Sequence, residues 1–323
     1  MLTNYIKIAL RNLKRHKAYS MLNIAGLAIG MACSILILLW VQQEQSYDRF
    51  HTNASHLFRL RGSAGDFHAA VSPAGMGAGL QRELPQVKAF VRLSHLQATL
   101  FEHGNTKLSE KNTFYADSNF LDIFSFELAA GNRQLAMSRP DAVIITEEMA
   151  MKYFGTKNAV GKTLKRNNRD LVTVTGVFNN IPSASHLQFD FIMPIAAIAG
   201  EHNDLKTNTW DNFNFYTYLL LDQSVVAGEP SVKALEKQIN RIYQEHQKSQ
   251  KINFFLQPLT EIHLLSNLQV DLPGHGNKQY VSIFLIVAIF ILVVACINFM
   301  NLATARSARR AREVGIRKVA GAT

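Results

Sequence analysis

The stretch at residues 155–163 is the part of the sequence that most resembles a nucleotide-binding loop. It reads GTKNAVGKT, with glycine, lysine and threonine in the order of a Walker A loop. Such a loop needs four residues between its glycines, whereas five separate Gly155 from Gly161. It must also precede a helix, whose N-terminus then faces the phosphates. Here the expected helix, 147–154, comes before the glycines, so we interpret the stretch as a turn and expect no ATP binding.

The other candidates for chemistry are weaker. Gly75, Gly77 and Gly79 form a cluster without a dinucleotide-binding unit around it, and close helix packing explains them as well as a ligand does. His51 and His56 are five residues apart, so they do not share a helical face, and no acidic third ligand is evident. No serine has the setting of a nucleophile elbow. We therefore predict no catalytic, cofactor-binding or metal-binding residue and no cofactor, and hence a protein that is not an enzyme.

Two apolar stretches dominate the organisation of the chain, one at residues 21–42 and one at 280–305. Each is long enough, at about 1.5 Å per helical residue, to cross a bilayer of about 30 Å. The first is too long for the apolar part of a cleaved signal peptide, and no cleavage-type motif follows it, so we predict an anchor. Each stretch contains one cysteine, Cys33 and Cys296, which we expect to be buried packing residues.

The second apolar stretch contains two polar side chains, Asn298 and Asn301, near its basic end. Asparagine in a membrane helix often packs against another helix through a hydrogen bond. The alternative is a polar transport path, which the sequence favours less because both side chains are uncharged and close to the membrane surface. We predict that both residues serve membrane-helix packing.

The net charge of +10 lies at the two ends of the chain. The first 43 residues carry five Lys or Arg and no acid, and residues 306–323 carry six and one acid. Residues 44–279 carry 23 basic and 23 acidic side chains. A DNA-binding domain would carry its basic patch on the folded body, so nucleic acid is not an expected partner. Basic residues beside apolar spans instead place both ends in the cytoplasm and the middle segment outside it.

The middle segment alternates strand and helix patterns. We predict strands at 56–61, 87–93, 214–221 and 252–256, with helices at 73–84 and 231–247 between them. Two such βαβ units in one domain indicate a split, ferredoxin-like sheet in an α+β membrane protein. Between the two units, residues 97–192 read as an inserted, mostly β subdomain with strands at 142–146 and 171–178.

Four blocks of the sequence carry a family resemblance. The first two are IALRNLKRHKAYSMLNIAGLAIG (8–30) and SYDRFH (46–51). The third joins AVIITEEMAMKYFG and GKTL (142–164) with VTGVFNNIPSASHLQFDF (174–191), and the fourth is ACINFMNLATARSARRAREVGIRKVAGAT (295–323). On these blocks the chain resembles ABC-transporter permeases of the MacB/FtsX type. The last block fits the cytoplasmic signature R-x-x-E-[IV]-G-[IV]-R-K-x-x-G-A of such proteins, at Arg310, Glu313, Val314, Gly315, Ile316, Arg317, Lys318, Gly321 and Ala322.

The resemblance implies a division of the chain. Residues 1–20 would be a cytoplasmic amphipathic helix, 21–42 and 280–305 transmembrane helices, and 43–279 a MacB-like periplasmic core domain. That domain would have a porter part, at about 43–96 and 193–279, and an inserted sabre-like subdomain at about 97–192. Residues 306–323 would be a cytoplasmic coupling segment that begins an incomplete, C-terminally truncated FtsX-like permease domain, because family members have further membrane helices after this signature.

The resemblance also implies a function and partners. Such permeases transmit ATP-driven motion from a separate cytoplasmic ABC ATPase to the periplasmic domain, which is called mechanotransmission, for export, efflux or extraction of a substrate. The other implied partners are a second permease copy or tandem half, membrane lipids and a periplasmic adaptor, in a bacterial inner membrane that the chain crosses more than once. The expected ATPase-coupling residues are Arg312, Glu313, Gly315, Arg317 and Lys318.

One alternative function comes from a different class of protein. A membrane-anchored sensor could bind a ligand with its outer domain and have no ATPase partner. A sensor that continues into a kinase would have a heptad or helical-bundle pattern after the second span, which Gly315 and Gly321 do not favour. The basic segment itself has a plain alternative role, because positive charge beside a span sets topology and attracts lipid headgroups.

Overall fold

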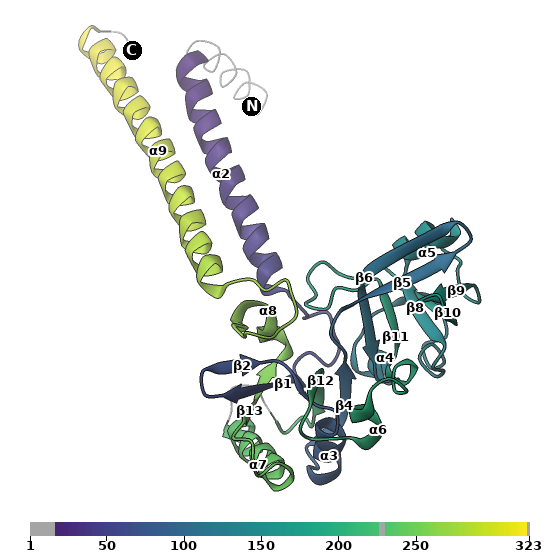
Figure 1. Cartoon of the computed structure of the whole chain (residues 1–323). Coiled ribbons are helices and arrows are strands. Elements are labelled where there is room, and N and C mark those ends of the chain that lie inside the picture. The colour runs from purple at the N-terminus through teal and green to yellow at the C-terminus, as the bar shows by residue number, and fades with distance from the viewer. Residues whose placement is uncertain (1–16, 226–229, 322–323) are drawn as a thin grey trace. The chain divides into compact units, whose positions relative to one another are not determined.

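The structure is a computed structural model that describes residues 17–225 and 230–321 (Figure 1). The chain divides into two compact units. Unit 1 comprises the two end segments, Met1–Gln45 and Asn277–Thr323, and unit 2 comprises Ser46–Gly276. Most of the amphipathic helix expected at residues 1–20 lies outside the described residues.

Unit 1 is a pair of long helices, α2 (Lys17–Gln45) and α9 (Lys278–Val319). Within them, Ile24–Gln45 and Lys278–Asn301 are long and apolar enough to cross a membrane. Both spans are free of proline, and their aliphatic residues favour helix, so a continuous helix is the expected conformation.

The second helix does not end at residue 305, where the membrane span was predicted to finish. α9 runs on to Val319 and stops just before Gly321, whose φ is +80°. This left-handed conformation is easy for glycine and is a common way to end a helix. The basic segment from residue 306 to 319 is therefore a direct extension of the membrane span, and Gly315 lies inside this helix.

The first half of unit 2 is a four-stranded antiparallel sheet in the order β4-β12-β1-β13. Its elements are, in chain order, β1 (Leu57–Ala64), α3 (Met76–Glu83), β4 (Val87–Leu93), β12 (Phe213–Leu221), α7 (Pro230–His246) and β13 (Asn253–Pro258). The strands of β1-α3-β4 and β12-α7-β13 interleave in the sheet. This is the split ferredoxin-like arrangement that the sequence pattern predicted.

Two helices cover one face of this sheet, where α3 and α7 share a buried cluster with Phe58, Leu60 and Phe254 (Figure 1). In α7 the buried positions are Val232, Leu235, Ile239, Ile242 and Tyr243, which repeat at helical spacing. The opposite face packs on a second cluster rich in phenylalanine. Each face of the sheet therefore has its own core.

The chain between β4 and β12 builds the second half of unit 2. Its strands follow the order β11-β8-β10-β9-β5-β6, and β6 joins β4 through one register pair, Leu93 with Ala116. The strands are β5 (Gln97–His103), β6 (Thr106–Ala116), β7 (Leu128–Gly131), β8 (Ala142–Thr146), β9 (Thr163–Arg166), β10 (Asp170–Phe178) and β11 (Phe191–Pro194). The short helices are α4 (Phe120–Ile123), α5 (Glu147–Phe154) and α6 (Asn203–Thr207). The division at residues 97 and 192 stays a prediction.

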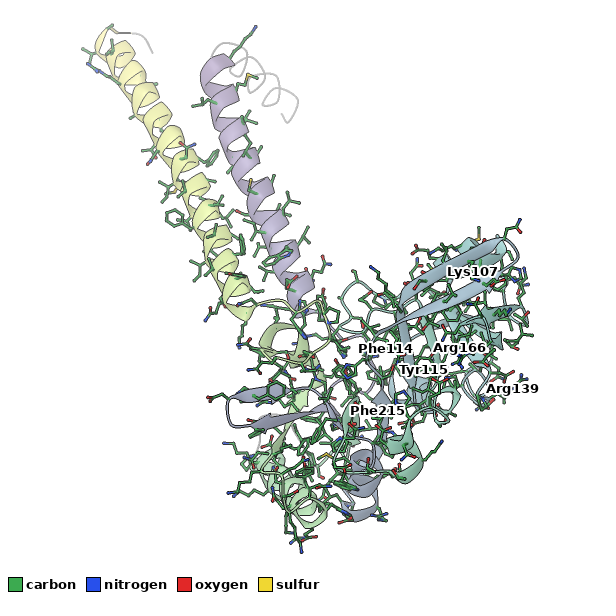
Figure 2. The ribbon with its side chains drawn as sticks, in the orientation of Figure 1. Lys107, Phe114, Tyr115, Arg139, Arg166 and Phe215 are labelled. Atoms are coloured by element: carbon green, nitrogen blue, oxygen red, sulfur yellow. The ribbon has the colours of Figure 1, made fainter. Side chains whose placement is uncertain are left out.

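Local sequence explains the best-defined part of this half. All five residues of β8 are buried, and β8 pairs in parallel with β10, as a short Val/Ile-rich run predicts. The Oγ1 of Thr146 accepts a hydrogen bond from Met149 N and begins α5, and Gly155 ends it with φ +65°. A polar contact also lies inside this half, where Arg166 Nη1 is 3.4 Å from the Tyr115 hydroxyl (Figure 2).

One expectation differs from the structure, and one element was not predicted. The predicted helix at 73–84 begins only at Met76, because Ser72–Pro73 forms the short strand β3 against Phe213 and Phe215 of β12. Proline has no N–H to donate, so it is better placed at the edge of a sheet than inside a helix. The long hairpin of β5 and β6, which turns at Gly104 with φ +57°, was not defined from the sequence.

The open edge of β13 is covered by side chains of α7. Asn240 Nδ2 donates to the carbonyl of Phe254 (2.9 Å), and its Oδ1 accepts from Phe254 N (2.7 Å). Glu236 Oε1 accepts from Leu256 N (2.9 Å). An exposed strand edge would invite pairing with another chain, so these contacts satisfy the edge and protect it.

We predict that Asn240→Ala lowers the free energy of unfolding of residues 46–276 by about 2 kcal/mol, because it leaves two backbone groups of β13 without partners. Arg241→Ala, at a neighbouring position whose side chain is 75% exposed, is the matched control and should change stability by less than about 0.5 kcal/mol. Urea unfolding followed by circular dichroism measures both. Equal effects of the two substitutions would contradict this role for Asn240.

Candidate functional site

The two membrane helices pack through small residues of α2. A Cβ on Gly30 would lie 2.8 Å from the Cβ of Ala295, closer than side chains normally approach. One turn further on, Ser34 Oγ donates to the carbonyl of Ala288 (3.0 Å). Small residues spaced four apart, as Gly30 and Ser34 are, let two membrane helices approach closely. The pair is therefore held by backbone proximity, and a larger residue at Gly30 would separate it.

The predicted packing residues lie one to two turns from Ala295, toward the basic end of α9. Asn298 faces α2, since its Nδ2 is 3.5 Å from the place a Cβ on Gly26 would take. Asn301 is exposed. Their role in packing stays a prediction. Both cysteines, Cys33 and Cys296, are exposed in the helix pair, so the expectation that they are buried was wrong.

The predicted coupling residues form part of the last turns of α9. Arg312, Gly315, Ile316 and Val319 follow helical spacing and share one face. Arg312 and Gly315 are exposed, and no atom lies within 4 Å of a Cβ built on Gly315. Ile316 and Val319 are 62% and 91% exposed. Glu313, Arg317 and Lys318 belong to the same helix. The segment thus offers an open surface with both charge and apolar area.

The two glycine-rich stretches have structural explanations. Residues 155–162 form the turn between α5 and β9, and Gly161 N donates to the carbonyl of Val174 (2.7 Å). Gly77 and Gly79 of α3 lie so close to Phe90 and Trp210 that a Cβ would sit 2.4 Å and 2.2 Å from their rings. A helix packed directly on aromatic rings requires glycine at these positions. Within the described ranges, no three His, Cys, Asp or Glu side chains are grouped so as to hold a metal ion.

A buried charged cluster lies directly after α2, in the SYDRFH block. Asp48 has φ +59°, a conformation that aspartate tolerates better than most residues. Its Oδ1 is 2.8 Å from His186 Nδ1 and accepts the backbone N–H of His186 (3.1 Å). His186 Nε2 lies 2.7 Å from the Tyr218 hydroxyl on β12. Burial opposes ionisation of Asp48, but the charge and hydrogen bonds of His186 outweigh it and lower the pKa of that carboxyl.

His51, three residues further on, is held neutral in an aromatic setting. Its ring lies against Phe124 and Phe126, with centroids 5.2 Å and 5.0 Å away. Its Nδ1 accepts the backbone N–H of Ser125 (3.0 Å). Burial, together with the nearby His186 charge, lowers the pKa of His51 to about 4, although Asp48 acts in the opposite direction.

A second buried charged cluster lies before α9. Arg59 of β1 is fully buried, and its Nη1 and Nη2 are 2.5 Å and 3.0 Å from the two carboxylate oxygens of Asp271. Nη2 also donates to Gln257 Oε1 (2.8 Å), and His275 Nε2 is 3.0 Å from Asp271 Oδ2. Burial raises the pKa of Asp271, but the bonds from His275 and Arg59 hold it well below its usual range.

The sequence did not predict that Asp48 contacts His186 or that Arg59 contacts Asp271. Asp48 and His186 are 138 residues apart, and Arg59 and Asp271 are 212 apart. An available indication was Arg59 itself, a charge in the middle of the predicted strand 56–61. A charged residue among apolar strand neighbours is seldom fully buried unless it is paired.

The fold is that of an α+β domain carried between two apolar helices, and solved structures resemble it. A domain of a protein described as a permease from Porphyromonas gingivalis has a TM-score of 0.56 at 22% identity, covering 73% of this chain and 99% of that one. The periplasmic region of MacB from Actinobacillus actinomycetemcomitans has a TM-score of 0.47 at 13% identity (65% and 91% covered). The extracellular domain of the ABC-type transporter YknZ from Gram-positive bacteria has 0.44 at 16% (62% and 99%).

Sequence comparison establishes the family. The MacB-like periplasmic core domain family matches residues 20–242, which is more than half of the chain. The chain therefore belongs to this family, whose members are permease-type components of ABC transporters. No curated protein matches the chain. The predicted resemblance to MacB/FtsX-type permeases is confirmed at this level.

We predict that the stability of residues 46–276 falls as the pH decreases from about 6.5 to about 4, partly because of His51. The folded state lowers the pKa of His51, so protonation favours the unfolded chain, and the stability present above pH 6.5 is lost on acidification. The expected loss from this residue between pH 7.5 and 5 is on the order of 2 kcal/mol. Burial also lowers the pKa of His95, which adds a loss of the same sign.

His51→Asn keeps an acceptor for Ser125 N but cannot bind a proton in this range. Urea unfolding at pH 7.5, 6 and 5 should therefore show a flatter pH dependence for this variant than for the wild type. His103→Asn, at an exposed histidine, is the control and should keep the wild-type slope. An unchanged slope in His51→Asn would show that this ring does not titrate as described.

Proposed function

We propose that this chain is the permease subunit of a MacB/FtsX-type ABC transporter. In this proposal a separate cytoplasmic ATPase drives movement of the helices, and the movement changes the arrangement of the outer domain so that a substrate is exported or extracted. The observation that carries the proposal is the unbroken helix α9, which joins the membrane span to the basic signature without a hinge. A displacement of the signature would therefore displace the span with it.

The proposed contact with the ATPase is the exposed face of the last turns of α9. Arginine can form paired, fork-like bonds with carboxylates that lysine does not reproduce, so Arg312 and Arg317 would give a specific contact. Gly315 would let a partner approach the helix backbone closely. The ATP-driven step requires the ATPase to interact differently with two states of this segment, since a switch needs differential interaction with both states.

The remaining parts of the proposal concern the setting. The family and the two apolar spans support a bacterial inner membrane protein with a periplasmic domain, several spans and a second permease copy or tandem half. A periplasmic adaptor and lipid contacts belong to the same proposal. The chain itself would hold no ATP site, which the helix-before-glycine order at 155–162 supports.

We predict that Gly315→Leu and Glu313→Lys abolish binding of the complete protein to its partner ABC ATPase, while membrane insertion is retained. A leucine at Gly315 would block close approach, and lysine at position 313 would reverse a charge in the contact. Arg309→Lys keeps the charge and lies outside the core of the signature, so it should be mild. The measurements are co-purification of the ATPase and its stimulated ATP turnover for the three variants.

The competing explanation is that the segment acts only through its positive charge. Lipid attraction contributes on the order of 1 kcal/mol per basic residue and depends on net charge alone. Gly315→Leu changes no charge, so normal co-purification and turnover in this variant, with graded loss on removal of basic residues, would reject the coupling role.

A further inference from the structure

The two ends of unit 2 meet at one residue, His263. Tyr47 lies two residues after the end of α2, and Gly276 lies two residues before the start of α9. The ring of Tyr47 stacks on the ring of His263, with centroids 3.3 Å apart and planes 1° from parallel. The carbonyl of His263 accepts the N–H of Gly276 (2.9 Å). One residue of α8 (Ile262–Leu265) therefore contacts both ends of the unit.

Each end is also fixed to the centre of the sheet by a buried charge. Asp48 holds the first end through His186, which lies 2.7 Å from Tyr218 on β12. Asp271 holds the second end through Arg59 on β1. Arg59 and Tyr218 are register partners on these neighbouring strands. The two buried interactions therefore reach neighbouring positions of the sheet, although Asp48 and Asp271 lie near opposite ends of the sequence of unit 2.

Backbone hydrogen bonds reinforce both ends. Asp48 N donates to the carbonyl of Ala184 (2.8 Å). Before α9, Gln269 N donates to the carbonyl of His68 (2.9 Å), and Ala70 N donates to that of Val270 (2.8 Å). The segment before α9 thus runs alongside the strand β2 (Phe67–Ala69) as if it were a further strand.

The two buried pairs are costly to break because water does not reach them. The side chains of Asp48 and Arg59 are inaccessible, and that of Asp271 is 5% exposed. Removing one partner of a buried pair leaves an uncompensated charge, which is far more costly than breaking a surface pair. Arg139 and Asp141 form such a surface pair, with side chains 61% and 41% exposed (Figure 2). The ion pairs of Asp48 and Asp271 are thus buried, whereas that of Arg139 with Asp141 is exposed to water.

We propose that residues 46–51 and 263–276 form one rigid root, in which Tyr47, Asp48 and Asp271 are positioning residues. The stacked rings of Tyr47 and His263 join the two segments to each other, and the buried pairs of Asp48 and Asp271 join them to β12 and β1. This inference goes beyond the proposed function, because it concerns the mechanics of this chain and requires no ATPase.

The test is hydrogen exchange with mass spectrometry on the full chain in lipid nanodiscs. In the wild type, peptides covering 46–52 and 268–276 should be protected to a degree similar to the peptide 213–221 of β12. Tyr47→Ala removes the stacked ring, and we expect it to raise exchange at least tenfold in both root segments while 213–221 is unchanged. The rise at 268–276, more than 200 residues away in the sequence, is the decisive result.

Matched variants separate the root from general destabilisation. Tyr47→Phe keeps a ring to stack on His263 and should raise exchange in 268–276 far less than Tyr47→Ala does. Asp141→Asn breaks the exposed pair and should leave both root segments protected. Asp48→Asn keeps the shape of the side chain but loses its charge, and should raise exchange at 46–52 and at 184–187; if this variant does not fold, Tyr47→Ala still decides.

Two results would overturn the inference. Exchange of either root segment at the rate of a free chain in the wild type would show that the ends are not fixed. A Tyr47→Ala variant that loosens 46–52 but leaves 268–276 at the wild-type rate would show that the two ends are independent linkers. Neither result depends on whether an ATPase binds the chain.

Discussion

The structure depends most on the apolar surface of two helices that unit 1 does not bury. Only 11% of the first span and 17% of the second lie inside the structure. Apolar area left in water costs about 25 cal/mol per Å², so helices of this kind are stable only when lipid or other helices cover them. A bilayer also requires every backbone polar group to be satisfied within the chain, which helices achieve. The membrane therefore accounts for the form of both helices, and every strand among the described residues lies in unit 2.

Unit 2 differs from the membrane helices, because it has a charged surface and also two ion pairs in its interior. Most ion pairs that the described residues form are at least partly exposed, as in Lys88 with Asp222 or Lys107 with Glu102. The pairs of Asp48 with His186 and of Arg59 with Asp271 are buried. Buried pairs contribute little net stability compared with apolar residues of the same size, but they penalise any other arrangement of their partners. Their position beside the ends of the unit is consistent with a mechanical role.

The sequence predicted the elements better than it predicted their contacts. The strand at 87–93 and the helix at 147–154 have the predicted bounds, because their hydrophobic spacing and their caps are local properties. The split sheet also followed from the order of elements, since few topologies satisfy two βαβ units in one domain. The α+β class with flanking apolar helices is confirmed.

What the sequence did not provide depends on contacts between distant residues. Nothing local to Arg59 indicates that its partner is Asp271, and nothing local to Tyr47 indicates that it stacks on His263. That the membrane span and the basic segment form one unbroken helix was not defined from the sequence, because the change from apolar to basic composition marks a membrane surface and does not tell whether the helix continues. The coupling residues rest on family resemblance, and the exposure of Arg312 and Gly315 in α9 does not identify a partner.

We propose that α2 and α9 place unit 2 and the basic end of α9 on opposite sides of a membrane. Single cysteines can test this in a chain in which Cys33 and Cys296 are replaced by alanine: Asn105→Cys in the exposed turn between β5 and β6, and Ile316→Cys near the end of α9. A membrane-impermeant maleimide applied to spheroplasts should label Asn105→Cys at once and Ile316→Cys only after permeabilisation. Labelling of both positions, or of neither, before permeabilisation would contradict the two-span arrangement on which the account rests.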